Sequence, residues 1–198
     1  IMILPVLPGA KIGVLGGGQL GRMLAQACRR MCYQLHVFSP EKNSPAGQLA
    51  NHETIASYEN LDAVQTFAKA VDLVTFEFEN VPVATAAAAA EYVPVHPDGR
   101  VLEIAQNRLK EKTVLSANGF PVTRFRSVNS AEETRAAATE FGAPSILKSA
   151  GFGYDGKGQA VVNDADQAIS AWEAVVGYAD GVSTTSEAES GPAAILEH

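Results

Sequence analysis

The chain has 198 residues, of which 46% are hydrophobic and 19% are charged, and its formal net charge is −7. These values are typical of a globular protein with one large domain or two small ones. No basic stripe interleaved with aromatic residues occurs, which argues against nucleic acid as the main partner. The apolar start, residues 1–8, is short and contains two prolines, so we expect neither a signal peptide nor a membrane span there. With only Cys28 and Cys32, no disulfide framework is possible, and we expect a reducing compartment such as the cytoplasm.

The first predicted elements are a buried strand, a glycine turn and a helix. The strand covers residues 11–15, and the turn, residues 16–21, matches the pattern Gly-x-Gly-x-x-Gly. A glycine turn that leads into a helix N-terminus is an anion-binding arrangement and suggests a dinucleotide fold. The next strand, residues 35–39, ends in Ser39 and not in the acid that NAD binding favours, and Glu41 follows a proline. Close packing of the helix on the strand is the alternative explanation of the glycines.

The alternation of strands and helices continues to about residue 107. Asn60 is positioned to cap a helix, and Pro82 begins an alanine-rich one. Between them lies a buried strand from residue 72, with Glu77 and Glu79 at its end, where the ligand crevice of a parallel sheet is found. The alternative is a pair of solvated acids. A further strand is expected at residues 92–96, so we predict a doubly wound α/β domain over residues 1–107.

The second segment, residues 108–198, is predicted to mix helices with strands. A charged helix over residues 106–119 ends in Asn-Gly, a strand follows at 123–128, and Ser130 with Glu133 forms a capping box. Asp164 is predicted to cap a helix with Ile169, Trp172 and Val176 on one face. A mobile surface excursion is expected to follow over residues 178–192. Residues 193–198 read as a strand that stops where a site residue is expected, which suggests a fragment of a longer protein.

A glycine-rich hairpin, residues 146–162, is the feature with the clearest chemistry. Lys148 stands at the end of its first strand, and the loop contains four glycines and Lys157. Glycines let backbone N–H groups approach phosphate oxygens, and lysines supply point charges, so the hairpin is suited to binding a polyphosphate. It is not a Walker loop, because the spacing differs and no helix follows directly. An ordinary hairpin with a glycine-rich turn is the alternative.

Four motifs in order resemble one family. They are residues 16–23 (Gly-Gly-Gly-Gln-Leu-Gly-Arg-Met), 76–82 (Phe-Glu-Phe-Glu-Asn-Val-Pro), 106–112 (Gln-Asn-Arg-Leu-Lys-Glu-Lys) and 153–159 (Gly-Tyr-Asp-Gly-Lys-Gly-Gln). The set resembles the ATPase subunit of phosphoribosylaminoimidazole carboxylase, also called 5-(carboxyamino)imidazole ribonucleotide synthase, an ATP-grasp enzyme of purine biosynthesis. The resemblance implies a Rossmann-like pre-ATP-grasp domain that binds the ribonucleotide, over residues 1–107. A linker helix and the N-terminal ATP-grasp subdomain would then occupy residues 108–198, with the C-terminal half absent.

The implied reaction is the ATP-dependent carboxylation of aminoimidazole ribonucleotide with bicarbonate, through carboxyphosphate. The resemblance implies that ATP is bound by Arg108, Lys148, Gly153, Tyr154, Asp155, Gly156, Lys157, Gly158, Gln159, Glu197 and His198. Of these, it gives Tyr154, Asp155 and Lys157 a catalytic role beside the substrates. It places the ribonucleotide at Gly18, Gln19, Leu20 and Glu77. It also implies a homodimer and Mg²⁺, whose ligands would lie in the absent half and not in this chain, so we expect the chain alone to be inactive.

Some features depart from the family or leave other functions open. The loop entry at residues 149–152 lacks the threonine and basic residues of some members, and the excursion at 178–192 is longer than usual. One alternative function is an NAD(P)-dependent oxidoreductase module, which rests on the glycine fingerprint alone and leaves the lysine hairpin unexplained. The other is a non-catalytic nucleotide-binding module that senses ATP without turnover.

Overall fold

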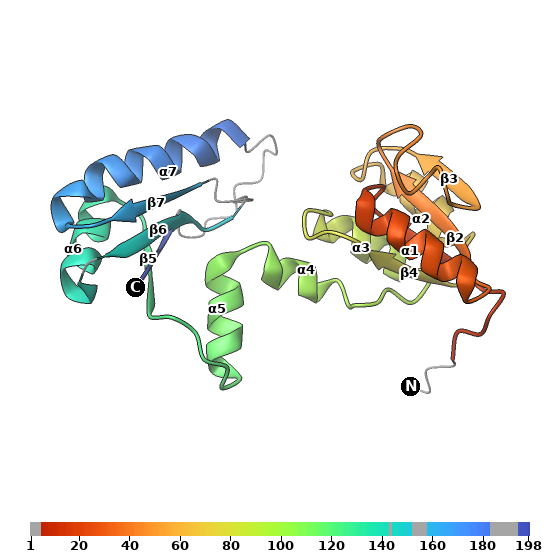
Figure 1. Cartoon of the computed structure of the whole chain (residues 1–198), viewed down its shortest axis with the longest axis horizontal. Coiled ribbons are helices and arrows are strands. Elements are labelled where there is room, and N and C mark those ends of the chain that lie inside the picture. The colour runs from red at the N-terminus through yellow and green to blue at the C-terminus, as the bar shows by residue number, and fades with distance from the viewer. Residues whose placement is uncertain (1–4, 143, 152–157, 183–193) are drawn as a thin grey trace. The chain divides into compact units, whose positions relative to one another are not determined.

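The computed structural model describes residues 5–142, 144–151, 158–182 and 194–198 (Figure 1). The chain divides into two compact units, Ile1–Glu103 and Ile104–His198. None of the helices in the described ranges has the length and apolarity needed to cross a membrane.

The first unit is built on a parallel sheet of β1 (Lys11–Leu15), β2 (Gln34–Ser39), β3 (His52–Ile55) and β4 (Leu73–Phe76). The strand order is β3-β2-β1-β4, and every pairing is parallel. Chain order therefore runs outward from β1 in both directions, and the place where it reverses lies beside β1. In such sheets, ligands bind at the carboxyl ends of the strands next to this reversal.

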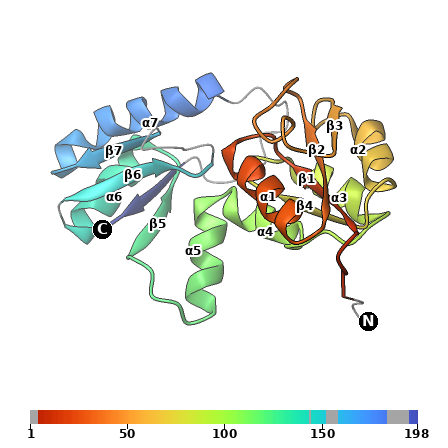
Figure 2. The ribbon, with the colours of Figure 1, turned by 45° about the vertical axis from the view of Figure 1, so that its right-hand side comes forward.

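Helices cover both faces of this sheet (Figure 2). On one face α1 (Gln19–Arg30) packs Ala25 and Cys28 against Val14 and Val37. On the other face α2 (Leu61–Ala68) and α3 (Val83–Ala90) pack around a cluster that contains Leu15, Phe38 and Phe67. Because neighbouring residues of a strand point to opposite faces, Val14 and Leu15 pack into different hydrophobic cores. The prediction of a doubly wound α/β domain is confirmed.

The second unit is an antiparallel sheet covered on one face by two helices. Its strands are β5 (Phe125–Val128), β6 (Ser145–Ser149), β7 (Gln159–Val162) and β8 (Ala194–Glu197), in the order β5-β8-β6-β7. The covering helices are α6 (Ala131–Phe141) and α7 (Ala168–Val182), with the short η1 (Ala165–Gln167) before α7. Leu147 and Leu196 point into the core beneath them. Earlier in the chain come α4 (Arg100–Ala105), which the sequence did not predict, and α5 (Arg108–Ala117).

Three expectations drawn from the sequence are wrong in detail. Residues 92–96 do not form a strand, since only a single parallel bridge joins Val95 to Val74. Helix α7 buries Ala168, Ala171 and Val175, while Ile169 is exposed. Trp172 is partly buried against the same core, so the predicted face is wrong at Ile169. Residues 178–182, predicted to begin an excursion, belong to α7 instead. The rest of the predicted excursion lies outside the described part of the chain.

Candidate functional site

The first candidate site lies at the carboxyl ends of β1 and β4, where Glu77 meets the start of α1. One oxygen of the Glu77 carboxylate accepts the Gly18 N–H at 2.8 Å, and the other accepts the Gly21 N–H at 3.1 Å. The first N–H groups of a helix have no partner within the helix, and its N-terminus favours negative charge. Glu77 therefore caps α1 from across the sheet and fills part of the anion site that the glycine fingerprint creates.

The fingerprint glycines make this contact possible. Gly16 has a φ of 127°, and a Cβ built on it would lie 2.2 Å from Cγ of Glu77. No side chain fits at that position while the carboxylate caps the helix. Gln19 and Leu20 are exposed at the beginning of α1, beside the capped turn. Glu79, predicted to lie with Glu77 at the ligand crevice, is exposed, whereas Glu77 is half-buried.

A cleft of about 220 Å³ opens beside this cap. Its lining consists of residues from the ends of β1, β2 and β4 and from the segment after β3: Gly17, Gly18, Ser39, Pro40, Glu41, Tyr58, Glu77 and Phe78. Burial raises the pKa of Tyr58 to about 12, a hydrogen bond with Ser39 acts in the opposite direction, and the charges of Glu77 and Glu41 raise it further. The Tyr58 hydroxyl is therefore a neutral hydrogen-bonding group in an acidic cleft. Sequence reasoning missed Tyr58, which no motif includes.

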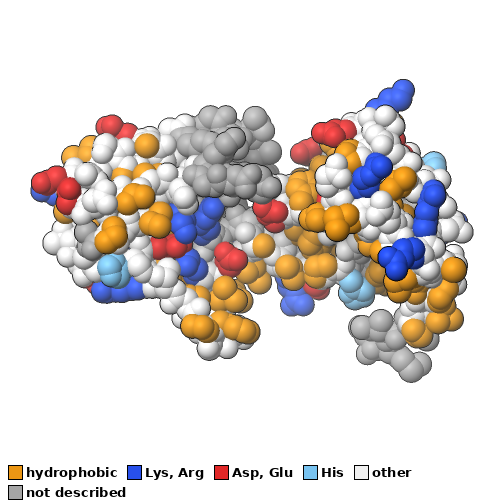
Figure 3. Space-filling view, viewed as in Figure 1, with side chains coloured by type: hydrophobic (Ala, Val, Ile, Leu, Met, Phe, Trp, Pro, Cys, Tyr) orange, Lys and Arg blue, Asp and Glu red, His pale blue; other side chains and the backbone are white. Residues whose placement is uncertain are grey.

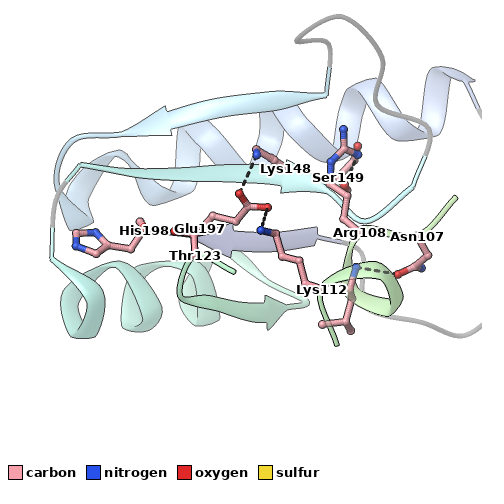
Figure 4. A network of polar contacts seen from close by, with 9 residues as sticks. Asn107, Arg108, Lys112, Thr123, Lys148, Ser149, Glu197 and His198 are labelled. Atoms are coloured by element: carbon pink, nitrogen blue, oxygen red, sulfur yellow. Dashed lines mark hydrogen bonds and ion pairs between the residues drawn. The ribbon is translucent and has the colours of Figure 1, made fainter. Parts of the chain in front are cut away.

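The second candidate site lies on the face of the second sheet opposite α6 and α7 (Figure 4). Lys148 of β6 donates a hydrogen bond to Oε2 of Glu197 in β8, at 2.8 Å. Lys112 of α5 places its Nζ 3.4 Å from Oε1 of the same carboxylate. That distance is an ion-pair distance, although Oε1 accepts no well-aligned hydrogen bond among the described residues. The Glu197 side chain is only 9% exposed, so its charge is compensated by two lysines and not by water.

Strand register explains why these side chains meet. Glu197 pairs with Ile146, and Ile195 pairs with Lys148, so Lys148 and Glu197 are diagonal neighbours on adjacent strands. The alternate residues Leu147 and Leu196 point to the helix-covered face, which leaves Lys148 and Glu197 on the other face. The lysine at the end of a strand was predicted, but its pairing with a residue 49 positions later was not.

The start of α5 is fixed to the end of β6. The Arg108 N–H donates to the Ala150 carbonyl at 2.8 Å, and its guanidinium donates to the Ser149 carbonyl at 3.1 Å. The side chain of Asn107 caps the helix by accepting the N–H groups of Leu109 and Lys110, each at 3.0 Å. Arg108 is thereby brought beside the strand that carries Lys148. Lys112 was not predicted, although its place four residues after Arg108 puts both on the same side of the helix.

The remaining predicted residues are distributed as follows. Gly153, Tyr154, Asp155, Gly156 and Lys157 lie outside the described residues. Gly158 immediately precedes β7, and its carbonyl accepts the Ser149 N–H at 2.8 Å. Gln159 begins β7 and pairs with Lys148. The His198 N–H donates to the Arg124 carbonyl at 3.0 Å, and its ring lies 6.5 Å from that of Phe141.

Charged side chains give further limits on ligands. In the described ranges, no group of three or more His, Cys, Asp or Glu side chains converges on a possible metal position. On the face shown in Figure 3, Lys and Arg side chains occur in separate groups, with acidic and hydrophobic side chains between them.

Comparisons with known proteins agree with this two-part architecture. The family model of the ribonucleotide synthetase preATP-grasp domain matches residues 9–106, and that of the ATP-grasp domain matches residues 113–186. The N5-carboxyaminoimidazole ribonucleotide synthase of Brucella melitensis is 42% identical over 170 residues, which are 85% of this chain and 47% of that protein. This chain belongs to the N5-carboxyaminoimidazole ribonucleotide synthase family. The chain spans about half the length of the synthases it matches.

Solved structures of the family show the same fold. A crystal structure of an N5-carboxyaminoimidazole ribonucleotide synthetase in complex with ADP superposes with a TM-score of 0.82 at 36% identity, covering 97% of this chain and 47% of that chain. A structure of the synthase from Aspergillus clavatus in complex with ADP and 5-aminoimidazole ribonucleotide gives a TM-score of 0.79 at 30% identity, covering 96% of this chain and 46% of that chain. The predicted family and fold are confirmed.

Proposed function

We propose that the protein carrying this chain is an ATP-dependent ligase that carboxylates 5-aminoimidazole ribonucleotide. A bicarbonate oxygen attacks the γ-phosphorus of ATP, which gives carboxyphosphate and ADP. The exocyclic amine of the ribonucleotide then bonds to the carboxyl carbon, directly or after carbon dioxide is released, and phosphate and a proton leave. The product is 5-(carboxyamino)imidazole ribonucleotide, an intermediate of purine biosynthesis. As further parts of this proposal, the protein acts in the cytoplasm and as a homodimer.

The observation that carries the proposal is the cluster of Lys148, Glu197 and Lys112 on the open face of the second sheet. We assign Lys148 and Arg108 to the ATP phosphates, because both cations lie at the same end of β6 and phosphoryl transfer depends on compensating phosphate charge. Glu197 and His198, at the end of β8, are assigned to the adenine and ribose. Family structures in complex with ADP or ATP support the binding of a nucleotide by this fold.

The hairpin loop is proposed to close over the triphosphate. It comprises Gly153, Tyr154, Asp155, Gly156 and Lys157, with Gly158 and Gln159 at its return into β7. Tyr154, Asp155 and Lys157 are proposed to act on bicarbonate and the amine. ATP would arrive with Mg²⁺, which neutralises phosphate charge when bound.

The cleft in the first unit is proposed to hold the ribonucleotide, through Gly18, Gln19, Leu20 and Glu77. Two N–H groups at the start of α1 already bind the Glu77 carboxylate, and Glu41 adds a second acid. An acidic cleft suits the hydroxyl and amine groups of the ribonucleotide better than its phosphate. The hydrogen bonds of Glu77 also argue against an NAD(P)-binding module. The pyrophosphate of a dinucleotide would need the backbone N–H groups that already donate to the Glu77 carboxylate.

The test is phosphate release from ATP and bicarbonate, measured with and without aminoimidazole ribonucleotide. We expect release that depends on the ribonucleotide from the full-length product of the gene. Because the chain spans about half of its relatives, we propose that residues 1–198 alone do not turn over. Full activity of the isolated chain would contradict that proposal. Absence of ribonucleotide-dependent release from every product of the gene would contradict the function.

Lys148→Met tests the nucleotide site directly. Loss of an ammonium that compensates phosphate charge should raise the KM for ATP by about tenfold or more, by the usual strength of charge-assisted contacts. Lys42→Met is the matched control, because Lys42 is an exposed lysine of the first unit and its loss changes the net charge equally. An unchanged KM in Lys148→Met would contradict the assignment.

A further inference from the structure

Lys112 belongs to the lysine–glutamate cluster, although no proposed role of the site uses it. It comes from helix α5, whereas Lys148 and Glu197 come from the sheet. Its side chain is 16% exposed, its Nζ is 3.4 Å from Oε1 of Glu197, and the ring of Phe125 lies 5.9 Å from that Nζ. An exposed lysine would contribute little in such a pair, but this one is held against a carboxylate that is nearly withdrawn from water.

The cluster has one carboxylate and two ammonium groups (Figure 4). If Lys148 alone faced Glu197, the two would form an ion pair with no net charge. A phosphate would then have to compete with Glu197 for the Lys148 ammonium. With Lys112 on the other carboxylate oxygen, the cluster has an excess positive charge. We infer that Lys112 is a positioning residue that compensates the charge of Glu197, so that the Lys148 ammonium is available to a nucleotide phosphate.

The energetic reason is the cost of a buried charge without a counter-ion. When a phosphate binds the Lys148 ammonium, the interaction between Lys148 and Glu197 becomes weaker. Without Lys112, the carboxylate would then be left under-compensated and would face an anionic ligand. Lys112 prevents this, because it approaches from the other side of the carboxylate and does not depend on Lys148 (Figure 4).

The backbone of α5 fixes Lys112 in this position before any ligand binds. The Asn107 cap sets the start of the helix, and the Arg108 N–H joins it to the Ala150 carbonyl at the end of β6. Lys112 is one helical turn further along. The ammonium therefore reaches Glu197 without rearrangement of the chain, and this pre-organisation avoids an entropy cost on binding.

The experiment measures ATP affinity by titration, together with the KM for ATP where turnover is observed. This inference rests on the proposed nucleotide site. For Lys112→Met we expect ATP binding to weaken about tenfold, a typical effect of one partly buried charge, with kcat changed much less. Lys112→Arg should restore most of the affinity because it keeps the charge, and Lys42→Met should match the unsubstituted protein. Equal affinity in Lys112→Met and the unsubstituted protein, or no recovery with arginine, would overturn the inference.

A second background separates positioning from direct contact. In the Glu197→Gln background no carboxylate needs compensation, so removing Lys112 should change the ATP affinity by less than about twofold, as expected when a coupled partner is already gone. A loss of about tenfold in that background would mean that Lys112 contacts the nucleotide itself, and would overturn the positioning role. Thermal melting of each variant shows whether it is folded.

The outcomes distinguish this inference from the proposed function. If ATP binds and its affinity depends on Lys112, but phosphate release never depends on the ribonucleotide, the inference stands and the proposed reaction fails. If turnover is as proposed and Lys112→Met behaves like the unsubstituted protein, only the inference fails. If no product of the gene binds ATP, both are overturned.

Discussion

Glu77 shows how one residue defines the first candidate site. The glycine fingerprint is visible in the sequence, and so is an acid at the end of the fourth strand. Their contact depends on the parallel pairing of β1 with β4, which brings Leu15 opposite Phe76 and Glu77 next to the turn. No local pattern encodes a contact between residues 59 positions apart. The sequence therefore predicted the glycine turn and the acid, but not the hydrogen bonds between them.

Replacement of Glu77 should destabilise the first unit. In Glu77→Ala, the N–H groups of Gly18 and Gly21 lose their acceptor, and we expect a loss of about 1–3 kcal/mol, the usual range for such half-buried contacts. Glu77→Gln keeps one oxygen acceptor and should lie in between. Urea denaturation measures the change. Glu41→Ala removes an exposed carboxylate from the same cleft and should stay within about 0.5 kcal/mol. Equal stability of Glu77→Ala and Glu41→Ala would show that the cap contributes nothing.

At the scale of elements, helix ends were predicted better than helix faces. The caps at Asn60, Ser130 and Asp164 are confirmed, because each side chain accepts an N–H at the start of its helix. Such contacts are local, so sequence spacing reveals them. The buried face of α7 was predicted only in part, since Trp172 packs against the core while Ile169 is exposed. Which face is buried depends on contacts with distant strands, which sequence spacing does not show.

The cap of α6 gives a quantitative prediction for one element. The Ser130 hydroxyl accepts the Glu133 N–H at 3.1 Å, and the Glu133 carboxylate accepts the Asn129 N–H at 2.8 Å. Ser130→Ala should reduce the free energy of unfolding by about 1 kcal/mol, as is typical of N-cap serines. Ser116→Ala, at an exposed position inside α5, should be neutral or slightly stabilising because alanine favours helix. Trp172 is the only tryptophan and is partly buried against the core of the second unit, so its fluorescence reports the transition. A cost of Ser130→Ala no larger than that of Ser116→Ala would show that this cap is not stabilising.

At the scale of the whole chain, the order of two α/β units and their family followed from the sequence, but the pairing of the second sheet did not. Strand β8 comes last in the chain and yet lies between β5 and β6. Its apolar residues predict a strand. They do not predict that this strand is central in the sheet, where it pairs with two strands from distant segments of the chain. Lys112 and Glu197 meet through this arrangement. Site residues that depend on strand order are thus beyond local patterns, whereas those within one motif are not.

The pH dependence of stability should differ between the two units. Burial lowers the pKa of His36 below its ordinary value of 6.5, and the charges of His52 and Lys11 lower it further. The unfolded chain then binds a proton at higher pH than the folded one, so this stabilisation is present above pH 6.5 and is lost as the pH falls below it.

Glu53 acts at lower pH: burial raises its pKa, but hydrogen bonds from Ser44 and Asn43 bring it below 4.5 overall. Its contribution is present above pH 4.5 and is lost on further acidification.

We therefore expect the first unit to lose stability in two stages on acidification, while the Trp172 transition of the second unit is insensitive to substitutions at His36. Urea denaturation followed by hydrogen exchange in β1 and β2 reports the first unit. His36→Gln should remove the stage that begins near pH 6.5. His52→Gln should remove only part of this stage. Burial of His36 is a larger cause of its lowered pKa than the charge of His52, and burial remains in this variant. If His36→Gln keeps the full slope, or if His52→Gln removes it entirely, burial is not the main cause of the acid sensitivity.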